Sequence, residues 1–292
     1  MKYTGPIFRP PPEARTVLLQ VTVGCAHNKC SFCTMYRSTK FKIEQMDQIE
    51  KDLKEAKATY GSLDRIFLVN GDAFVLSYAK LKPIAEKIHE YFPEMKTITM
   101  YASVRNIMGK TDEELKELRD LGVNDLWVGV ETGNEEALGR LNKGFTLDDT
   151  YEQLRRLKDA GMDYNCILMF GTSGSGRGIE NAIDTAKLVN ETKPILLGVT
   201  SLGFFPGSEL TREVEEGRFD PATELEILEE EKKLIELVDV DDVFFFGAHP
   251  INTININGRL PRDKEYLMNA IDHIIATTDK AFLNSVPQRS SL

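Results

Sequence analysis

The sequence predicts a parallel α/β fold, and three observations support this prediction. Apolar segments alternate along the chain with helical ones, a pattern that calls for a parallel sheet with helices outside it. A helix–glycine–strand unit around Gly122 recurs around Gly161. The expected strands are apolar on both faces, as buried parallel strands are. We therefore expect a partial (β/α)6 parallel barrel with a C-terminal α/β extension.

The strands are expected where short apolar runs end in polar or glycine residues. The first run leads directly into a loop that holds three of the four cysteines. The six expected strands of the barrel are 16–23, 65–69, 97–102, 126–130, 165–170 and 195–202, and a further strand is expected at 243–246.

The helices follow from apolar periodicity and from capping signals. In the first helix, Ile49, Leu53 and Ala56 form one stripe. Thr111 and Glu114 fit a capping box, in which each side chain satisfies a free backbone N–H of the first turn. The expected helices are 43–60, 81–91, 111–121, 146–160, 208–216, 223–238 and 261–276.

Three parts are expected: an extended lead-in at 1–15, the barrel core at 16–205, and an extension at 206–292 that covers the barrel mouth. No apolar run is long enough to span a bilayer, and the first residues are polar and proline-rich, so we expect a cytoplasmic protein. The net charge of −10 argues against a broad nucleic-acid-binding surface. Close thiols in a reducing compartment indicate a metal site rather than disulfides.

The cysteine loop is the most informative feature of the chain. Cys25, Cys30 and Cys33 lie within nine residues, whereas Cys166 lies in an apolar strand and is expected to be a core residue. Iron–sulfur clusters usually have four cysteine ligands, so a cluster with three would leave one iron open. Zinc is the alternative, because Cys30 and Cys33 form half of a zinc knuckle that His27 could complete. A thioredoxin-like site would leave Cys25 unexplained.

The loop resembles that of radical S-adenosylmethionine (SAM) enzymes, although four residues separate its first two cysteines where three are usual. The resemblance extends over about residues 16–205. It implies that Cys25, Cys30 and Cys33 hold a [4Fe–4S] cluster whose open iron chelates SAM. It also implies that Phe32 packs near the adenine.

Further expected SAM contacts follow successive strands, where barrel loops carry functional sites. Asn70-Gly71-Asp72 resembles a degenerate form of the family's turn that holds the SAM ammonium group, and Ser103 and Arg105 are expected to reach the carboxylate or ribose. Each could instead be an ordinary turn or a surface ion pair. Glu131 is expected to bind ribose hydroxyls or to pair with Arg105, because a buried carboxylate needs a partner.

Glycine-rich residues 171–176 resemble the strand end that approaches the adenine, with Gly171 as the expected contact. A flexible turn is the plain alternative. Arg140 and Lys143 belong to a helical stretch, 138–143, that resembles one of the family's, but they are weaker candidates because cations on a helix surface usually face solvent.

The implied reaction is reductive cleavage of SAM to methionine and a 5′-deoxyadenosyl radical, which takes a hydrogen atom from a substrate. A flavodoxin or ferredoxin is the implied electron donor. The substrate, a small molecule or a peptide, is not identified by the sequence. Its expected contacts are Arg37, Lys42, His249, Asn252 and Arg259.

Fifteen residues before the core leave no room there for a vitamin B12 domain, and no second cysteine cluster indicates an auxiliary iron–sulfur cube. Two alternatives from other classes remain open. One is a non-enzymatic iron–sulfur or zinc protein, and the other is an enzyme that uses SAM only as a methyl donor.

Overall fold

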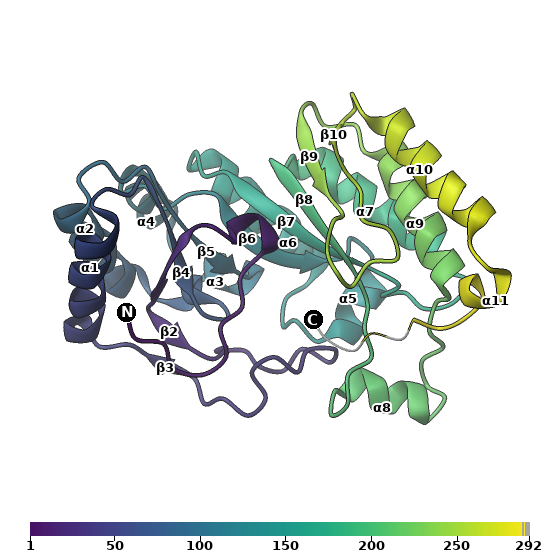
Figure 1. Ribbon diagram of the computed structural model, residues 1–292, viewed down its shortest axis with the longest axis horizontal. Coiled ribbons are helices and arrows are strands. Elements are labelled where there is room, and N and C mark those ends of the chain that lie inside the picture. The colour runs from purple at the N-terminus through teal and green to yellow at the C-terminus, as the bar shows by residue number, and fades with distance from the viewer. Residues whose placement is uncertain (288, 290–292) are drawn as a thin grey trace. The chain divides into compact units, whose positions relative to one another are not determined.

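The computed structural model describes residues 1–287 and 289 and divides into two compact units (Figure 1). Unit 1 comprises residues 1–28, 35–129 and 152–164, and unit 2 comprises residues 29–34, 130–151 and 165–292. The cysteine loop is therefore shared, because Cys25 belongs to unit 1 whereas Cys30 and Cys33 belong to unit 2.

Unit 1 contains a parallel sheet in the strand order β1-β4-β5-β6. The register pairs Val17 with Ile66 and Arg65 with Thr97, so every strand points the same way and the polar strand ends meet at one edge. The last two residues of β6 belong to unit 2. The strands are β1 (Val17–Gln20), β4 (Arg65–Val69), β5 (Thr97–Ala102) and β6 (Leu126–Glu131).

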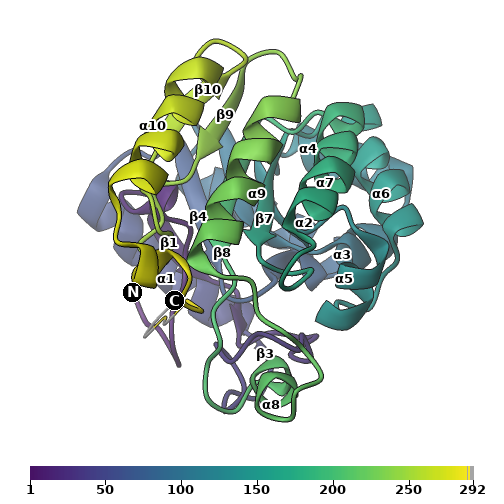
Figure 2. The ribbon, with the colours of Figure 1, turned by 90° about the vertical axis from the view of Figure 1, so that its right-hand side faces the viewer.

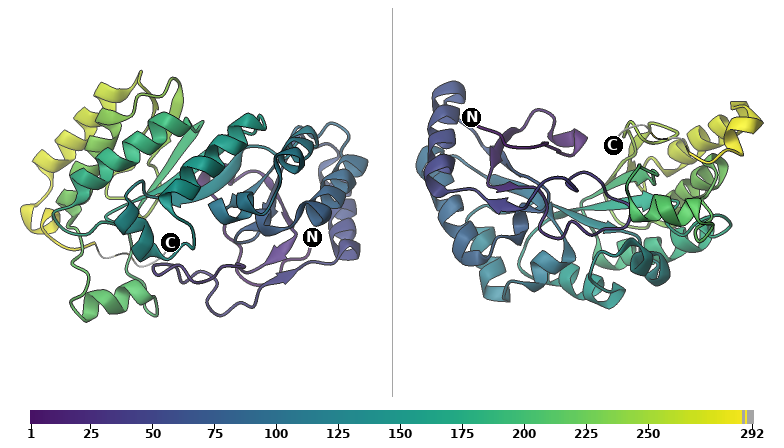
Figure 3. Two further views of the ribbon diagram at one scale, coloured as in Figure 1. Left: turned by 180° about the vertical axis from the view of Figure 1, so that it is seen from behind. Right: turned by 90° about the horizontal axis from the view of Figure 1, so that it is seen from below.

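The single strand expected at 16–23 is two strands. After β1 the chain changes partner, and β2 (Thr22–Val23) pairs antiparallel with β3 (Lys42–Ile43), drawn in purple (Figure 3). Between them, the N–H of Val21 donates to the carbonyl of Val69. Helix α1 therefore begins at Met46, three residues after the predicted start at residue 43, because Lys42–Ile43 form a strand.

The helices of unit 1 cover the sheet with the predicted apolar stripes. Ile49, Leu53 and Ala56 are fully buried. The capping box is confirmed, since the N–H of Thr111 donates to Glu114 and the N–H of Glu114 donates to the hydroxyl of Thr111. The helices are the 3₁₀ turns η1 (Pro11–Glu13) and η2 (Ala73–Val75), with α1 (Met46–Tyr60), α2 (Tyr78–Tyr91), α3 (Val104–Met108) and α4 (Asp112–Asp120).

Unit 2 contains four strands in the order β7-β8-β9-β10, of which the first three are parallel. The last strand pairs antiparallel with β9. These strands are β7 (Tyr164–Phe170), β8 (Leu196–Ser201), β9 (Val243–Phe246) and β10 (Asn257–Leu260). The predicted parallel α/β class is thus confirmed, and the region predicted as an extension adds two strands to this sheet.

The helices of unit 2 form a layer in which α9 packs against both α7 and α10 (Figures 2 and 3). Helix α7 was not delimited from the sequence, because its buried face is built largely from small and polar residues such as Asn181, Ala182 and Thr185. Helix α6 runs from unit 2 into unit 1. The helices are α5 (Glu135–Leu141), α6 (Leu147–Asp159), α7 (Gly178–Thr192), α8 (Glu209–Glu215), α9 (Glu224–Leu237), α10 (Lys264–Thr277) and α11 (Lys280–Leu283).

The predicted boundary near residue 205 does not coincide with the division between the units, since residues 165–292 belong to one unit. Among the described residues, none of the helices has the length and hydropathy needed to cross a bilayer.

Candidate functional site

The turn after β4 packs directly against the first cysteine. Asp72 accepts a hydrogen bond from the N–H of Ala26 at 3.1 Å and a second from the Cys25 side chain. Gly71 has φ +36°, and a Cβ at this position would lie 2.4 Å from the carbonyl oxygen of Gly24 and 2.9 Å from Cα of Cys25. Only glycine therefore allows the two loops to approach this closely.

Asn70 is fully buried at the start of the same turn. Its N–H donates to the hydroxyl of Thr22, and its Oδ1 accepts from the hydroxyl of Tyr36. The Tyr36 hydroxyl also accepts from the N–H of Gly71. The Nδ2 of Asn70 has no hydrogen-bond partner in the described chain. A buried amide donor without an acceptor is costly, so this atom suits a ligand with an anionic or carbonyl oxygen.

The loop after β5 is tied to the same turn. Ser103 is the N-cap of α3, and its N–H donates to Oδ1 of Asn106, whose side chain also contacts Asp72. Burial raises the pKa of Asp72, and the donors from Ala26, Asn106 and Cys25 only partly oppose that shift. Asp72 thus links two strand-end loops to the first cysteine.

Arg105 is exposed, and its guanidinium contacts Nδ1 of His27 at 3.2 Å. A guanidinium has no lone pair to accept with, so Nδ1 of His27 must be the acceptor. The charge of Arg105 is not neutralised by this contact and remains suited to a carboxylate.

Cys30 and Cys33 lie in a segment that is anchored on α5 within unit 2. The N–H and hydroxyl of Ser31 donate to the carbonyls of Leu141 and Arg140 at 3.0 and 2.8 Å. The N–H of Cys33 donates to the carbonyl of Cys30, which makes a tight turn between the two thiols. The backbone that carries both thiols is therefore fixed beside the end of α5.

Glu131 and Lys143 form a buried ion pair beside these thiols, with Nζ of Lys143 2.5 Å from Oε1 of Glu131. Each side chain is 9% exposed. Burial alone would lower the pKa of Lys143, but the charges of Glu131 and Cys30 raise it. Burial raises the pKa of Cys30 to about 11, and the ammonium of Lys143 opposes that rise. The ammonium of Lys143 thus lies where its charge favours the thiolate form of a cysteine ligand.

The prediction that Lys143 faces solvent from a helix surface is wrong. Helix α5 ends at Leu141, and Asn142 adopts the left-handed conformation, with φ +53°, as the helix cap. This turn carries Lys143 away from the helix surface into the interior. Arg140, by contrast, is half-buried and pairs with Glu213. The Leu-Asn-Lys-Gly sequence contains the signal, because asparagine is the non-glycine residue that most readily takes this cap.

Glu131 has a left-handed backbone at the end of β6, with φ +72°. Such a conformation costs of order 1–3 kcal/mol for a residue with a side chain and is concentrated at functional sites. Within unit 2, Glu131 is paired with Lys143, and its alternative pairing with Arg105 of unit 1 stays a prediction.

Phe32 is half-buried and packs against an apolar cluster of unit 2. The cluster consists of Leu141, Met169, Leu202, Leu210 and Phe219. The ring between the last two cysteines therefore anchors their segment to the core of the unit. Its predicted contact with adenine stays a prediction.

The glycine-rich loop after β7 is held by carboxylates of α9, which sequence reasoning missed. The N–H of Gly171, with φ +82°, donates to Glu230 at 2.9 Å. The N–H of Gly176 and the hydroxyl of Ser175 donate to Glu226. These loop donors are used within the protein, so the loop does not form an open phosphate cradle. The available sequence signal for this contact was the pair Glu226 and Glu230, which lie one turn apart on a charged helix.

The five predicted substrate contacts are divided between the two units. Arg37 and Lys42 are exposed residues of unit 1. In unit 2, Asn252 is buried, and its amide bonds Val199, Gly247 and Ser201, so it ties its loop to β8.

The other two predicted contacts also have local partners. His249 accepts from the N–H of Ile251, and burial lowers its pKa. Arg259 pairs with Asp242 and lies over the ring of Phe244. None of these contacts identifies a substrate.

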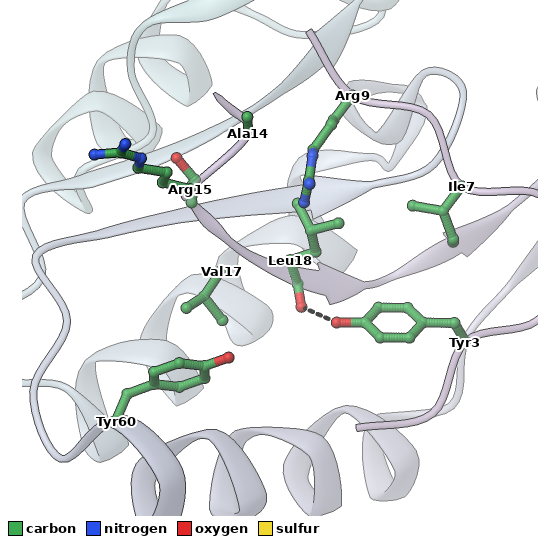
Figure 4. Close-up of a pocket in the computed structure, with 9 residues that line it drawn as sticks. Tyr3, Ile7, Arg9, Ala14, Arg15, Val17, Leu18 and Tyr60 are labelled. Atoms are coloured by element: carbon green, nitrogen blue, oxygen red, sulfur yellow. Dashed lines mark hydrogen bonds between the residues drawn. The ribbon is translucent and has the colours of Figure 1, made fainter. Parts of the chain in front are cut away.

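A cavity of about 440 Å³ in unit 1 is lined by residues of which none was predicted to be functional (Figure 4). Among them, the hydroxyl of Tyr3 donates to the carbonyl of Leu18. The lining residues are Tyr3, Ile7, Arg9, Ala14, Arg15, Thr16, Val17, Leu18 and Tyr60.

Within the described residues, no group of three or more histidine, cysteine or acidic side chains has the arrangement of a metal site. The cysteines belong to two units, so their joint role as ligands stays a prediction. The residues around each cysteine nevertheless fit the expected cofactors, since Lys143 supplies a cation beside Cys30 and Asn70 supplies an unused donor near Cys25.

Comparison with curated proteins gives two partial matches. The heme chaperone HemW of Bacillus subtilis (strain 168) is 26% identical over 168 residues, which cover 56% of this chain and 44% of that protein. The tRNA uridine(34) acetyltransferase of Methanocaldococcus jannaschii is 27% identical over 119 residues, which cover 40% of this chain and 22% of that protein. The chain thus spans less than half the length of the curated relatives that it matches.

Solved structures share the fold. Coproporphyrinogen III oxidase (HemN) from Escherichia coli aligns with a TM-score of 0.56 at 19% identity, over 76% of this chain and 51% of that one. Methylornithine synthase (PylB) aligns with a TM-score of 0.53 at 14% identity, over 89% of this chain and 81% of that one. The predicted partial-barrel class agrees with these neighbours.

A family model described as the radical SAM superfamily matches residues 19–188, which is more than half of the chain. The matched range begins in β1 and ends in α7, so it includes the cysteine loop and the loops after β4, β5 and β6. On this match and the shared fold, the chain belongs to the radical SAM superfamily, whose enzymes use a [4Fe–4S] cluster and SAM.

Proposed function

We propose that Cys25, Cys30 and Cys33 hold a [4Fe–4S] cluster at which the chain cleaves SAM to a 5′-deoxyadenosyl radical that takes hydrogen from a substrate. When bound by these three cysteines, a reduced cluster would supply the electron that breaks the sulfonium C–S bond of SAM. The protein's own task is to hold SAM and substrate in reactive geometry and to exclude water.

The observation that carries this proposal is the attachment of the Asn70–Asp72 turn to the first cysteine. Gly71 leaves no room for a side chain against Gly24 and Cys25, and Asp72 bonds both Ala26 and Cys25. A strand-end turn built this closely onto one cysteine supports a shared role in one site. An ordinary strand–helix turn needs no such approach.

The predicted site offers polar groups for the carboxylate and the ribose hydroxyls of SAM. In unit 1, Asn70 offers an unused buried donor and Arg105 offers a guanidinium. In unit 2, Glu131 offers a carboxylate whose position is fixed by Lys143. We assign Glu131 to the ribose hydroxyls and Arg105 to the SAM carboxylate, with Phe32 and Gly171 on the adenine side.

A flavodoxin or ferredoxin is the proposed electron donor. The two curated relatives, a heme chaperone and a tRNA acetyltransferase, differ in the molecules for which they are named, so they assign no substrate to this chain. Arg37 and Lys42 are the best-placed candidates for substrate contact, since both are exposed and follow the cysteine loop.

The proposal is tested with Cys30→Ala and Glu131→Ala after anaerobic reconstitution. Cys30→Ala is expected to lose both iron and SAM cleavage. Glu131→Ala is expected to keep the visible absorption of the cluster and to weaken SAM binding at least tenfold. SAM cleavage that persists in Cys30→Ala would contradict the cluster assignment, and unchanged affinity in Glu131→Ala would contradict its role.

A further inference from the structure

Lys110 is a buried lysine outside the set of predicted ligands. It is 4% exposed and follows α3 in unit 1. Within the described residues it makes no ion pair with a carboxylate. Burying an ammonium without a counter-ion is costly, and an apolar side chain such as methionine would fill the same space without this cost. A purely packing role therefore does not account for a lysine here.

The ammonium of Lys110 joins two segments of backbone. Its Nζ donates to the carbonyl of Phe74 at 2.7 Å and to the carbonyl of Asn106 at 3.2 Å. The same atom lies 4.0 Å from the centre of the Phe74 ring, so a cation–π contact occupies a further side of the ammonium. Phe74 itself is fully buried and cannot move to relieve these contacts.

Both segments lead directly into the proposed SAM site. Phe74 lies in η2, two residues after Asp72, and the N–H of Val75 donates to the carbonyl of Asp72. Asn106 bonds the N–H of Ser103, contacts the side chain of Asp72 and follows Arg105. Lys110 thus fixes the separation between the loop after β4 and the loop after β5.

We propose that Lys110 is a positioning residue for SAM binding, whose ammonium holds the Asn70–Asp72 turn and the Ser103–Asn106 turn at a fixed separation. This proposal rests on the proposed function, because it takes these two turns as SAM-binding loops. Lys110 bonds the carbonyls of Phe74 and Asn106, whereas Gly71 and Asp72 make the contacts with the first cysteine loop. We therefore expect Lys110 to act on SAM binding and not on cluster assembly.

The side chain of Lys110 changes its charge within a pH range that experiments on the folded protein can reach. Burial lowers its pKa to about 8, and Glu114 opposes this shift. The other charged groups at this place are Arg156, which donates to the carbonyl of Lys110, and Asp112, which pairs with Arg156. Above this pKa the ammonium loses one proton and its charge, so its contacts with the two carbonyls and the ring weaken.

The test compares Lys110→Met with Lys116→Met, an exposed lysine on α4 that serves as the matched control. Hydrogen exchange of the protein without cluster is measured over 70–76, 103–108 and α1. Lys110→Met is expected to exchange at least tenfold faster in the first two segments and unchanged in α1. After reconstitution, it is expected to keep its iron content and to bind SAM at least tenfold more weakly.

Uniformly faster exchange, or exchange equal to that of Lys116→Met, would overturn the proposal. If Lys110→Met does not fold, wild-type protection factors provide the second measurement. They are expected to fall several-fold in the two segments, but not in α1, between pH 7 and pH 9.5, and an unchanged pattern would also overturn the proposal. If wild-type protein binds no SAM while the exchange results hold, the proposed function fails and the joining of the two loops by Lys110 stands.

Discussion

Lys143 neutralises Glu131 inside unit 2, next to the thiol of Cys30. The two residues lie twelve positions apart and reach each other because β6 ends in a left-handed turn at Glu131 while α5 ends in another at Asn142. Each charge is too deeply buried to be stable alone. The pair therefore places a fixed carboxylate and a fixed ammonium beside a predicted cluster ligand.

Lys143→Met is predicted to destabilise the protein by about 3–5 kcal/mol, because it leaves the buried carboxylate of Glu131 without a counter-ion. The double variant Lys143→Met/Glu131→Gln is predicted to recover part of that loss, since it removes the remaining charge. The free energy of unfolding in urea, measured anaerobically on protein without cluster, gives both values.

The matched control for this prediction is Arg140→Met, which breaks the half-buried pair with Glu213 only three residues away. Pairs that reach solvent contribute roughly 0–1 kcal/mol. An equal loss in the free energy of unfolding for Lys143→Met and Arg140→Met would show that the buried pair stabilises the protein no more than the half-buried pair does.

Gly71→Ala is predicted to prevent normal placement of Cys25. The new Cβ would overlap the carbonyl oxygen of Gly24 and Cα of Cys25, and neither backbone atom can swing aside as a side chain could. Overpacking of this kind costs about 1–3 kcal/mol, and we expect iron bound per chain after reconstitution to fall by at least half. Iron and labile sulfide analysis measures the effect.

Gly61→Ala is the control for backbone strain alone. Gly61 also has a left-handed φ, +70°, but no atom lies within 4 Å of a Cβ built there. It should lose about 1–2 kcal/mol of stability and retain full iron loading. If Gly71→Ala loads iron as well as Gly61→Ala does, the close approach of the turn to Cys25 has no importance for the site.

The stability of the protein is predicted to fall as pH rises from about 4.5 to about 8, owing to two carboxyl groups of α9. Burial raises the pKa of both Glu230 and Glu231 from 4.5 to about 8. Over this interval the native state keeps protons that the unfolded chain has released. Stabilisation is therefore complete below the lower value and lost above the higher one, at up to about 1.4 kcal/mol per pH unit for each group.

Glu231→Gln tests this prediction. Among the described residues, Oε1 of Glu231 has no hydrogen-bond partner, so the substitution breaks no hydrogen bond at that atom. The variant should be more stable than wild type at pH 8 and should show a shallower fall in melting temperature from pH 5 to pH 8. Glu229→Gln, an exposed neighbour on the same helix, should behave as wild type. Identical pH profiles for all three proteins would refute the assignment.

The sequence was sufficient for most of the barrel, because its strands are apolar on both faces and its helices have clear caps. The bounds predicted for β4, β5 and β9 agree with the structure. Helix α7 was not predicted, because its buried face consists largely of small and polar residues. These residues are buried because α7 packs against α9, which the sequence alone does not show. The division of the first strand was also missed, because no local signal shows that β2 takes β3 as its partner.

The site was predictable where a residue's type reveals its chemistry and not where tertiary contacts decide its surroundings. Gly71 and Asp72 were assigned together from the motif, and their contact with the first cysteine loop supports that grouping. Lys143 and Lys110 were missed as buried groups, because a lysine is normally exposed and its burial depends on partners far away in sequence. The roles of Glu226 and Glu230 likewise depend on how α9 packs.

Formation of 5′-deoxyadenosine is the most direct test of the proposed cluster and its chemistry. The protein is reconstituted anaerobically with iron and sulfide, reduced with dithionite, given SAM and analysed by chromatography, with Cys30→Ala alongside and with iron and zinc measured in both. We predict four irons per chain and 5′-deoxyadenosine in the wild type, with neither in Cys30→Ala. Zinc in place of iron, or 5′-deoxyadenosine formed equally by Cys30→Ala, would show that the proposed cluster is wrong.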